Sequence, residues 1–194
     1  MTRLLYMVLL FFPSLLYADA LTDCFAKLEK QTLVSDFTVT MQSEASQPMT
    51  YTGHIVMRGE EFRVNMMDME IAYDGSVLYN YSEEQNELTL STPDLEELAA
   101  ANPLLYARTL VKNGDYTVTD RGDTYRIVLT PYDKTAGVQS FTLTLRKSDL
   151  MPLSAVMKET VSRQTVLTLR QPAFTSAKPS FVISKEGAYL NDLR

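Results

Sequence analysis

The stretch GHIVMRGEEFRVNM, residues 53–66, carries the pattern that decides the fold. Apolar and polar side chains alternate on either side of Arg-Gly-Glu-Glu at 58–61, as in two half-buried strands joined by a turn. The same period of two begins at residue 37, and it resumes from residue 116 to residue 183. About 11 short strands with short connections are expected, which favours an antiparallel meander because parallel strands need long crossovers.

Two other segments repeat their apolar residues with a helical period. Leu21–Leu33 has an apolar stripe that includes Cys24, which we interpret as a small buried side chain. Pro93–Lys112 reads as two short helices that are separated at Asn102-Pro103. The predicted fold class is α+β: a single large curved antiparallel β-sheet, or half-open barrel, with helices covering the concave apolar face.

The first twenty residues read as an export signal. A cation at Arg3 precedes an apolar run at 4–12 that is too short to span a bilayer, and Ala18-Asp19-Ala20 offers small residues for cleavage. We therefore predict a signal peptide at 1–20, cleavage after Ala20, and a single domain at 21–194 in the bacterial periplasm. An uncleaved anchor and lipidation at Cys24 are the alternatives, and Asp23 disfavours the second because a small residue is needed there.

Composition removes several function classes. The chain of 194 residues has a net charge of −6, which disfavours nucleic-acid binding. It has one Cys and one His, which exclude an intramolecular disulfide, a Cys-based zinc site and a multi-histidine centre. We expect no metal and no cofactor.

No catalytic constellation is visible either. The single His54 lies within an alternating strand segment, where a surface role is commoner than that of a base. The Glu pairs at 60–61, 83–84 and 96–97 fall in turns or on helix surfaces, where carboxylates are normally solvated. The protein is therefore not expected to be an enzyme, and a lipid or glycan hydrolase with dispersed carboxylates is the alternative from that class.

Methionine is frequent, with eight residues after position 20, at 41, 49, 57, 66, 67, 69, 151 and 157. Most are expected to be ordinary core residues. Flexible methionine side chains also suit ligands of variable shape such as acyl chains, so a partly unfilled apolar interior is the second interpretation.

Several motifs together resemble the outer-membrane lipoprotein carrier proteins, the LolA-like family. They are, in order along the chain, SDFT at 35–38, GHIVMRGEEFRVNM at 53–66, AYDGSVLYNY at 72–81, NPLL at 102–105, and FVI at 181–183 with GAY at 187–189. The resemblance extends over essentially the whole mature chain. Two positions depart from the family pattern: Gly59 replaces a proline after the arginine, and Val64 replaces a tryptophan.

The resemblance implies a monomeric periplasmic carrier that takes acylated lipoproteins from an inner-membrane ABC transporter and ferries them to an outer-membrane acceptor. It implies a lid, here Pro93–Lys112, over an apolar cavity, and it assigns Arg58 as the lid-gating residue that bonds backbone carbonyls of the empty lid. A carrier or sensor of another amphiphile, such as a glycolipid or an acyl intermediate, is the alternative within the same fold. The side chains expected to line the cavity are Phe37, Val39, Met41, Ile55, Met57, Phe62, Val64, Leu95, Leu98, Leu104, Leu105, Phe141, Leu143 and Leu145.

Overall fold

The computed structural model describes residues 18–44, 46–94, 97–98, 101–133, 137–159 and 162–194. Within these residues the chain forms the helices α1 (Ala18–Lys30) and α3 (Pro103–Asn113) and a single 12-stranded sheet. The strands are β1 (Thr32–Ser43), β2 (Ser46–Arg58), β3 (Glu61–Met66), β4 (Met69–Tyr73), β5 (Leu78–Ser82), β6 (Glu87–Ser91), β7 (Gly114–Asp120), β8 (Thr124–Pro131), β9 (Val138–Arg146), β10 (Pro152–Glu159), β11 (Arg163–Thr175) and β12 (Tyr189–Asp192).

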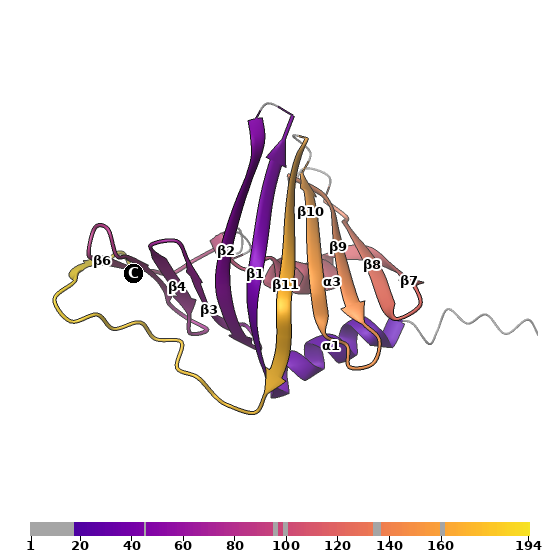
Figure 1. Cartoon of the computed structure of the whole chain (residues 1–194), viewed down its shortest axis with the longest axis horizontal. Coiled ribbons are helices and arrows are strands. Elements are labelled where there is room, and N and C mark those ends of the chain that lie inside the picture. The colour runs from indigo at the N-terminus through magenta and orange to yellow at the C-terminus, as the bar shows by residue number, and fades with distance from the viewer. Residues whose placement is uncertain (1–17, 45, 95–96, 99–100, 134–136, 160–161) are drawn as a thin grey trace, which may run out of the picture.

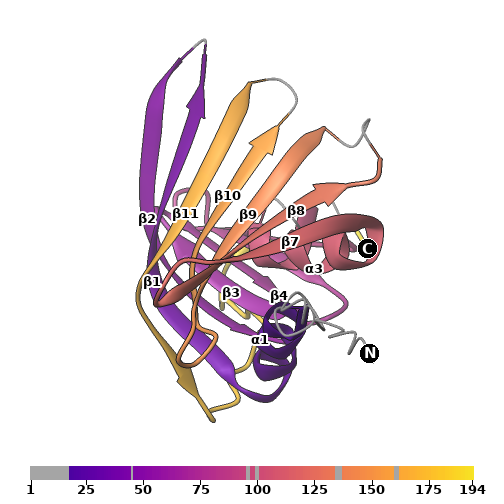
Figure 2. The ribbon, with the colours of Figure 1, turned by 90° about the vertical axis from the view of Figure 1, so that its right-hand side faces the viewer.

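The sheet runs in the order β12-β6-β5-β4-β3-β2-β1-β11-β10-β9-β8-β7. Its neighbouring strands are antiparallel except for β12 and β6, which are parallel. Figure 1 shows the long strands from the outer side of the sheet, and Figure 2 shows that the sheet curves around α1 and α3. The predicted α+β half-barrel with helices on its concave side is therefore confirmed.

Strand alternation separates the two faces of the sheet. Phe37 and Val39 of β1 and Ile55 of β2 are buried on the concave side, whereas Asp36, which precedes Phe37, is exposed. His54 of β2 lies opposite Asp36, and a hydrogen bond of 2.8 Å joins His54 Nδ1 and Asp36 Oδ1 on the outer surface. The concave side supplies the main core, whose fully buried members include Leu21, Leu33, Phe62, Ile127, Leu129, Phe141, Leu143 and Leu145.

The N-terminal helix differs from its predicted limits. We predicted a helix over 21–33, but α1 ends at Lys30, and Leu33 belongs to β1. The error is understandable because Leu33 is fully buried, like Leu21, Cys24 and Leu28 of the helical stripe. An inward-facing leucine fits the end of a helical stripe and the start of a strand equally well.

The C-terminal segment also corrects the sequence interpretation. The predicted strand at 181–183 is not formed, and these residues belong to an extended segment at 176–188, here called the C-terminal strap. Its Ile183 side chain packs with Ala72, Leu88 and Leu90 on the outer face of β4–β6. The strap then leads to β12, a strand that the alternation did not predict. Figure 1 shows the strap, in yellow, running from β11 to that edge of the sheet.

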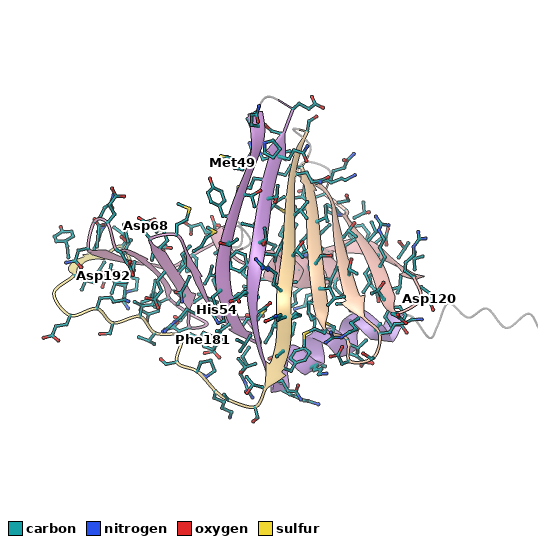
Figure 3. All side chains as sticks on the ribbon, in the orientation of Figure 1. Met49, His54, Asp68, Asp120, Phe181 and Asp192 are labelled. Atoms are coloured by element: carbon teal, nitrogen blue, oxygen red, sulfur yellow. The ribbon has the colours of Figure 1, made fainter. Side chains whose placement is uncertain are left out.

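Several polar contacts hold the C-terminal strap against the sheet. Arg63 Nη2 donates a hydrogen bond of 3.0 Å to the Val182 carbonyl oxygen, and Lys185 Nζ lies 2.7 Å from a carboxylate oxygen of Glu70. Phe181 of the strap is buried, and its place is labelled in Figure 3. Polar contacts and burial thus replace sheet pairing in this segment. In the described part of the chain, neither helix has the length and apolar character required to cross a bilayer.

Candidate functional site

An apolar pocket lies on the concave face of the sheet. It has a volume of about 100 Å³ and is bounded by the inner faces of β1–β4 and β11 and by the chain that enters α3. Its described lining carries no charged side chain and consists of Phe37, Val39, Met41, Ile55, Val64, Met66, Ile71, Ala101, Pro103, Thr165 and Leu167. Met41 lies toward the β1–β2 hairpin, where its side chain and that of Met49 are exposed, and Figure 3 labels Met49 near the hairpin end.

A short covering segment, made of the described residues within 94–102, lies before α3. Its start is fixed by reciprocal bonds, because Glu97 N donates to Asp94 Oδ1 at 2.9 Å and Asp94 N donates to Glu97 Oε2 at 3.1 Å. Leu98 N then donates to the Asp94 carbonyl oxygen at 3.1 Å, as in a first helical turn. These bonds agree with the helix start predicted at 92–94.

Asn102 joins the covering segment to α3. Its side chain is fully buried, and its Oδ1 accepts a hydrogen bond of 3.2 Å from Leu104 N, which makes it the N-cap of α3. Pro103 follows at the first helical position, where a missing N–H group is tolerated. The predicted break at Asn102-Pro103 therefore results from a buried cap.

The helix α3 presents one face to the sheet and one to α1. Leu104, Leu105, Ala107 and Leu110 are buried against the core. On its other side, the Arg108 guanidinium forms an ion pair with the Glu29 carboxylate of α1. The helix α3, which follows the covering segment, is therefore held by apolar packing against the sheet and by a charge pair with α1.

A second pocket of about 220 Å³ lies beside the first. It is formed where α3 faces β4 and the turn between β2 and β3. Its described lining is mixed, with apolar and charged side chains, and consists of Glu60, Tyr73, Leu98, Leu105, Arg108, Thr109 and Lys112.

The predicted cavity residues fall into distinct groups. The apolar pocket is lined by Phe37, Val39, Met41, Ile55 and Val64. The second pocket is lined by Leu98 and Leu105. Leu95 lies outside the described residues, and the remaining six are buried in the packed core: Met57, Phe62, Leu104, Phe141, Leu143 and Leu145.

Several lining residues were not predicted. Met66 and Ile71 lie on strands whose alternation was recognised, so the pattern could have identified them. Thr165 and Leu167 come from β11, which pairs with β1 across more than one hundred residues of sequence. Local periodicity contains no information on that pairing.

Arg58 is the last residue of β2, opposite Glu61 of β3. The alternation of β2 turns Ile55 and Met57 to the concave face, so Arg58 leaves the strand on the other side, one residue before the turn at Gly59. Its Nη1 atom is buried without a hydrogen-bond partner, and no bond joins Arg58 to the described residues of the predicted lid. The gating role of Arg58 stays a prediction.

Two further observations concern Cys24 and metal-ligating side chains among the described residues. Burial raises the pKa of the Cys24 thiol to about 12, against a smaller opposing effect of Lys27. The described residues contain no group of three or more His, Cys, Asp or Glu side chains that could hold a metal ion.

The comparisons with known proteins agree with this geometry. The family described as outer membrane lipoprotein carrier protein LolA matches residues 28–161. An uncharacterized conserved protein from Thermus thermophilus is 14% identical with a TM-score of 0.62, over 90% of this chain and 98% of that one, which shows a shared fold.

Two further solved structures are similar over most of their length. A putative outer membrane lipoprotein-sorting protein domain from Vibrio parahaemolyticus is 9% identical with a TM-score of 0.45, over 86% of this chain and 95% of that one. LprF from Mycobacterium bovis is 12% identical with a TM-score of 0.47, over 88% and 98% of the two chains. No curated protein matches the sequence. Since the family match extends from α1 to the end of β10 and covers most of the chain, this protein belongs to the outer membrane lipoprotein carrier protein family.

Proposed function

We propose that the protein is a periplasmic carrier that holds the acyl chains of lipoproteins on the concave face of its sheet. In this role it receives lipoproteins from an inner-membrane ABC transporter and delivers them to an acceptor at the outer membrane. The observation that carries the proposal is the uncharged pocket between the inner face of the sheet and the covering segment. Family membership supports the same role.

The size of the pocket indicates how it would be used. Apolar cavities of about 150 Å³ bind a single benzene-sized molecule. A pocket of about 100 Å³ therefore has room for only a few carbon atoms. A full acyl chain requires the lid, Pro93–Lys112, to move away from the sheet, so the arrangement described above corresponds to the closed position of the lid.

The energetics suit binding without chemical turnover. Burial of an acyl chain stabilises by about 0.8 kcal/mol for each CH₂ group, so two or three chains offset much of the free energy of extraction from a bilayer. Release is then as important as uptake. A lid that closes over a small residual pocket favours release because the closed state excludes the chain.

Arg58 would influence whether the lid is open or closed. A buried guanidinium nitrogen without an acceptor is unfavourable, so a state that supplies one is stabilised. Arg58 stands one residue from the turn that leads to Glu60, and Glu60 lies beside Arg108 of the lid. Arg58 leaves β2 on the outer side, so a lid carbonyl must reach the end of β2, at this turn, to accept from it and bias the lid between its two positions.

The direct test is lipoprotein release. Purified protein is added to spheroplasts that contain labelled lipoproteins, and the medium is assayed for a complex of label and protein. We expect release that stops when ATP-dependent transport is blocked. Absence of release from cells with an active transporter would contradict the proposal, and mass spectrometry of lipids that copurify would then identify another amphiphile. Protease treatment distinguishes the two cargoes, since it cleaves a lipoprotein and leaves a glycolipid intact.

A further inference from the structure

The two pockets are neighbours beneath one cover. Ile71 lines the apolar pocket and Tyr73 lines the second, and both lie on the inner face of β4, two residues apart. That spacing corresponds to about 7 Å along a strand. On the covering segment, Ala101 borders the apolar pocket and Leu98 borders the second. A ligand that lifts this segment can therefore occupy both pockets.

The second pocket differs from the first in its charge. Its floor is apolar, but α3 contributes Arg108 and Lys112, which are one helical turn apart and thus on the same side of the helix. Lys112 is exposed and forms no ion pair with the described residues. The protein as a whole carries a charge of −6, so an anion is attracted here by these two side chains and not by the overall charge.

Arg108 retains capacity for a further partner. Its Nη2 atom pairs with Glu29, whereas Nη1 lies 3.9 Å from the nearest oxygen of Glu60, beyond hydrogen-bond distance. The Glu60 side chain is 66% exposed, so its carboxylate can turn into solvent when another anion approaches. Lys112 and the Nη1 atom of Arg108 are then available to a single anionic group.

We propose that the second pocket binds the anionic headgroup, a phosphate or a carboxylate, of an amphiphile whose acyl chain enters the apolar pocket. The inference rests on the proposed carrier function and narrows its ligands. A phosphate above Leu98 and Leu105 accepts charge-assisted hydrogen bonds from Arg108 and Lys112. A lipid with the same chain and a neutral headgroup lacks those bonds and binds less tightly.

The test compares two ligands that differ only in the headgroup. Binding of palmitoyl lysophosphatidate and of monopalmitoylglycerol to the purified protein is measured by calorimetry below their micellar concentrations. We expect the phosphate lipid to bind at least about tenfold more tightly, as for one or two charge-assisted bonds. In Lys112→Met this preference should fall toward unity, whereas Lys112→Arg should retain it. Lys158→Met, a change of an exposed lysine on β10, is the matched control and should keep the preference.

The possible outcomes separate the two proposals. Equal affinities for both lipids would overturn the headgroup site and leave the carrier function supported. Failure of both lipids to bind would overturn the headgroup site, and the spheroplast assay would then decide the carrier function by itself. Inorganic phosphate alone is expected not to bind detectably, and phosphate binding as tight as that of the lipid would identify a free-anion site and contradict the role of the acyl chain.

Discussion

Arg108 of α3 forms an ion pair with Glu29 near the end of α1, and its guanidinium lies 5.8 Å from the Phe25 ring centroid of the same helix. Both helices lie on the concave side of the sheet (Figure 2), and this pair joins α3 to α1. The contact therefore connects the cover of the pocket to a helix that packs independently on the sheet through Leu21, Cys24 and Leu28.

Removal of the Arg108–Glu29 pair should weaken the attachment of α3 to α1 without unfolding the protein. The side chains of Arg108 and Glu29 are 24% and 50% exposed, so the pair contributes about 0.2–1 kcal/mol. We expect Glu29→Gln to accelerate exchange of bound lipid by about twofold to fivefold, in line with that energy, with little change in the denaturation midpoint. Stopped-flow transfer to vesicles measures the rate. Glu159→Gln, which removes the Glu159–Arg163 pair on the strands β10 and β11, is the control and should leave the rate unchanged.

Arg58→Leu tests the gating prediction. Nη1 of Arg58 has no hydrogen-bond partner. The substitution therefore breaks no hydrogen bond of this atom in the closed state, and the fold should persist. Loading or hand-over should decrease because the lid loses a donor in its alternative position. Circular dichroism checks the fold, and the spheroplast assay measures transfer. Transfer at the rate of the unmodified protein would remove Arg58 from the mechanism.

Gly53 leaves room for the Phe37 ring, which lines the apolar pocket. A Cβ atom at position 53 would lie 2.6 Å from Cζ of the Phe37 ring and would also collide with the Asn65 carbonyl oxygen. Gly53→Ala should therefore destabilise by about 1–3 kcal/mol, as overpacking does, and push the ring toward the pocket. Urea denaturation and lipid titration measure the two effects. Phe37→Leu removes part of the collision, so the double variant should lose less stability than the sum of the single variants; strict additivity would contradict the steric account.

Asp149 should make the free energy of unfolding decrease at acidic pH. Both guanidinium bonds from Arg146, at 2.9 and 2.8 Å, hold the pKa of the Asp149 carboxyl below its usual value against partial desolvation. The unfolded carboxyl titrates near pH 4, so the contribution is complete above that pH and disappears as pH falls through the lower folded-state pKa. Asp149→Asn should lower the free energy of unfolding at pH 7, and the difference from the unmodified protein should vanish once the pH is below the folded-state pKa of Asp149.

The measurement is urea denaturation at several pH values, with the difference between the two proteins as the readout. Asp123→Asn changes an exposed turn aspartate and serves as the control, with a small difference at every pH. If the stability deficit of Asp149→Asn stayed the same as the pH was lowered, the shape of the side chain and not its charge would account for the effect.

Cys24 should be chemically inert while the protein is folded. Its side chain is fully buried, and the raised pKa of about 12 leaves almost no thiolate at about pH 8. A colourimetric disulfide reagent should react with less than one thiol per chain in buffer and with one in concentrated urea. Rapid reaction in buffer would place the thiol at the surface and revive its lipidation as an alternative.

Local pattern was sufficient for most elements of this protein, although it missed β12 and wrongly placed a strand at 181–183. Alternation over 53–66 predicted β2 and β3 with their turn, and Asp74-Gly75 predicted the hairpin in which Asp74 Oδ1 accepts bonds from Ser76 N and Val77 N. Asn113-Gly114 ended α3 as expected. These features depend on neighbours within a few residues, so their physics is contained in the sequence window itself.

Only the tertiary structure decided which of these elements meet. The pairing of β1 with β11 brings Leu167 to the apolar pocket, and the parallel pairing of β12 with β6 draws the C-terminal strap over the outer face. The inward alternation of Phe141 and of Val39 is the same, yet one is packed in the core and the other lines the pocket. Periodicity fixes the face of a strand on which a side chain lies, whereas non-local pairing and the position of the helices fix what covers that face.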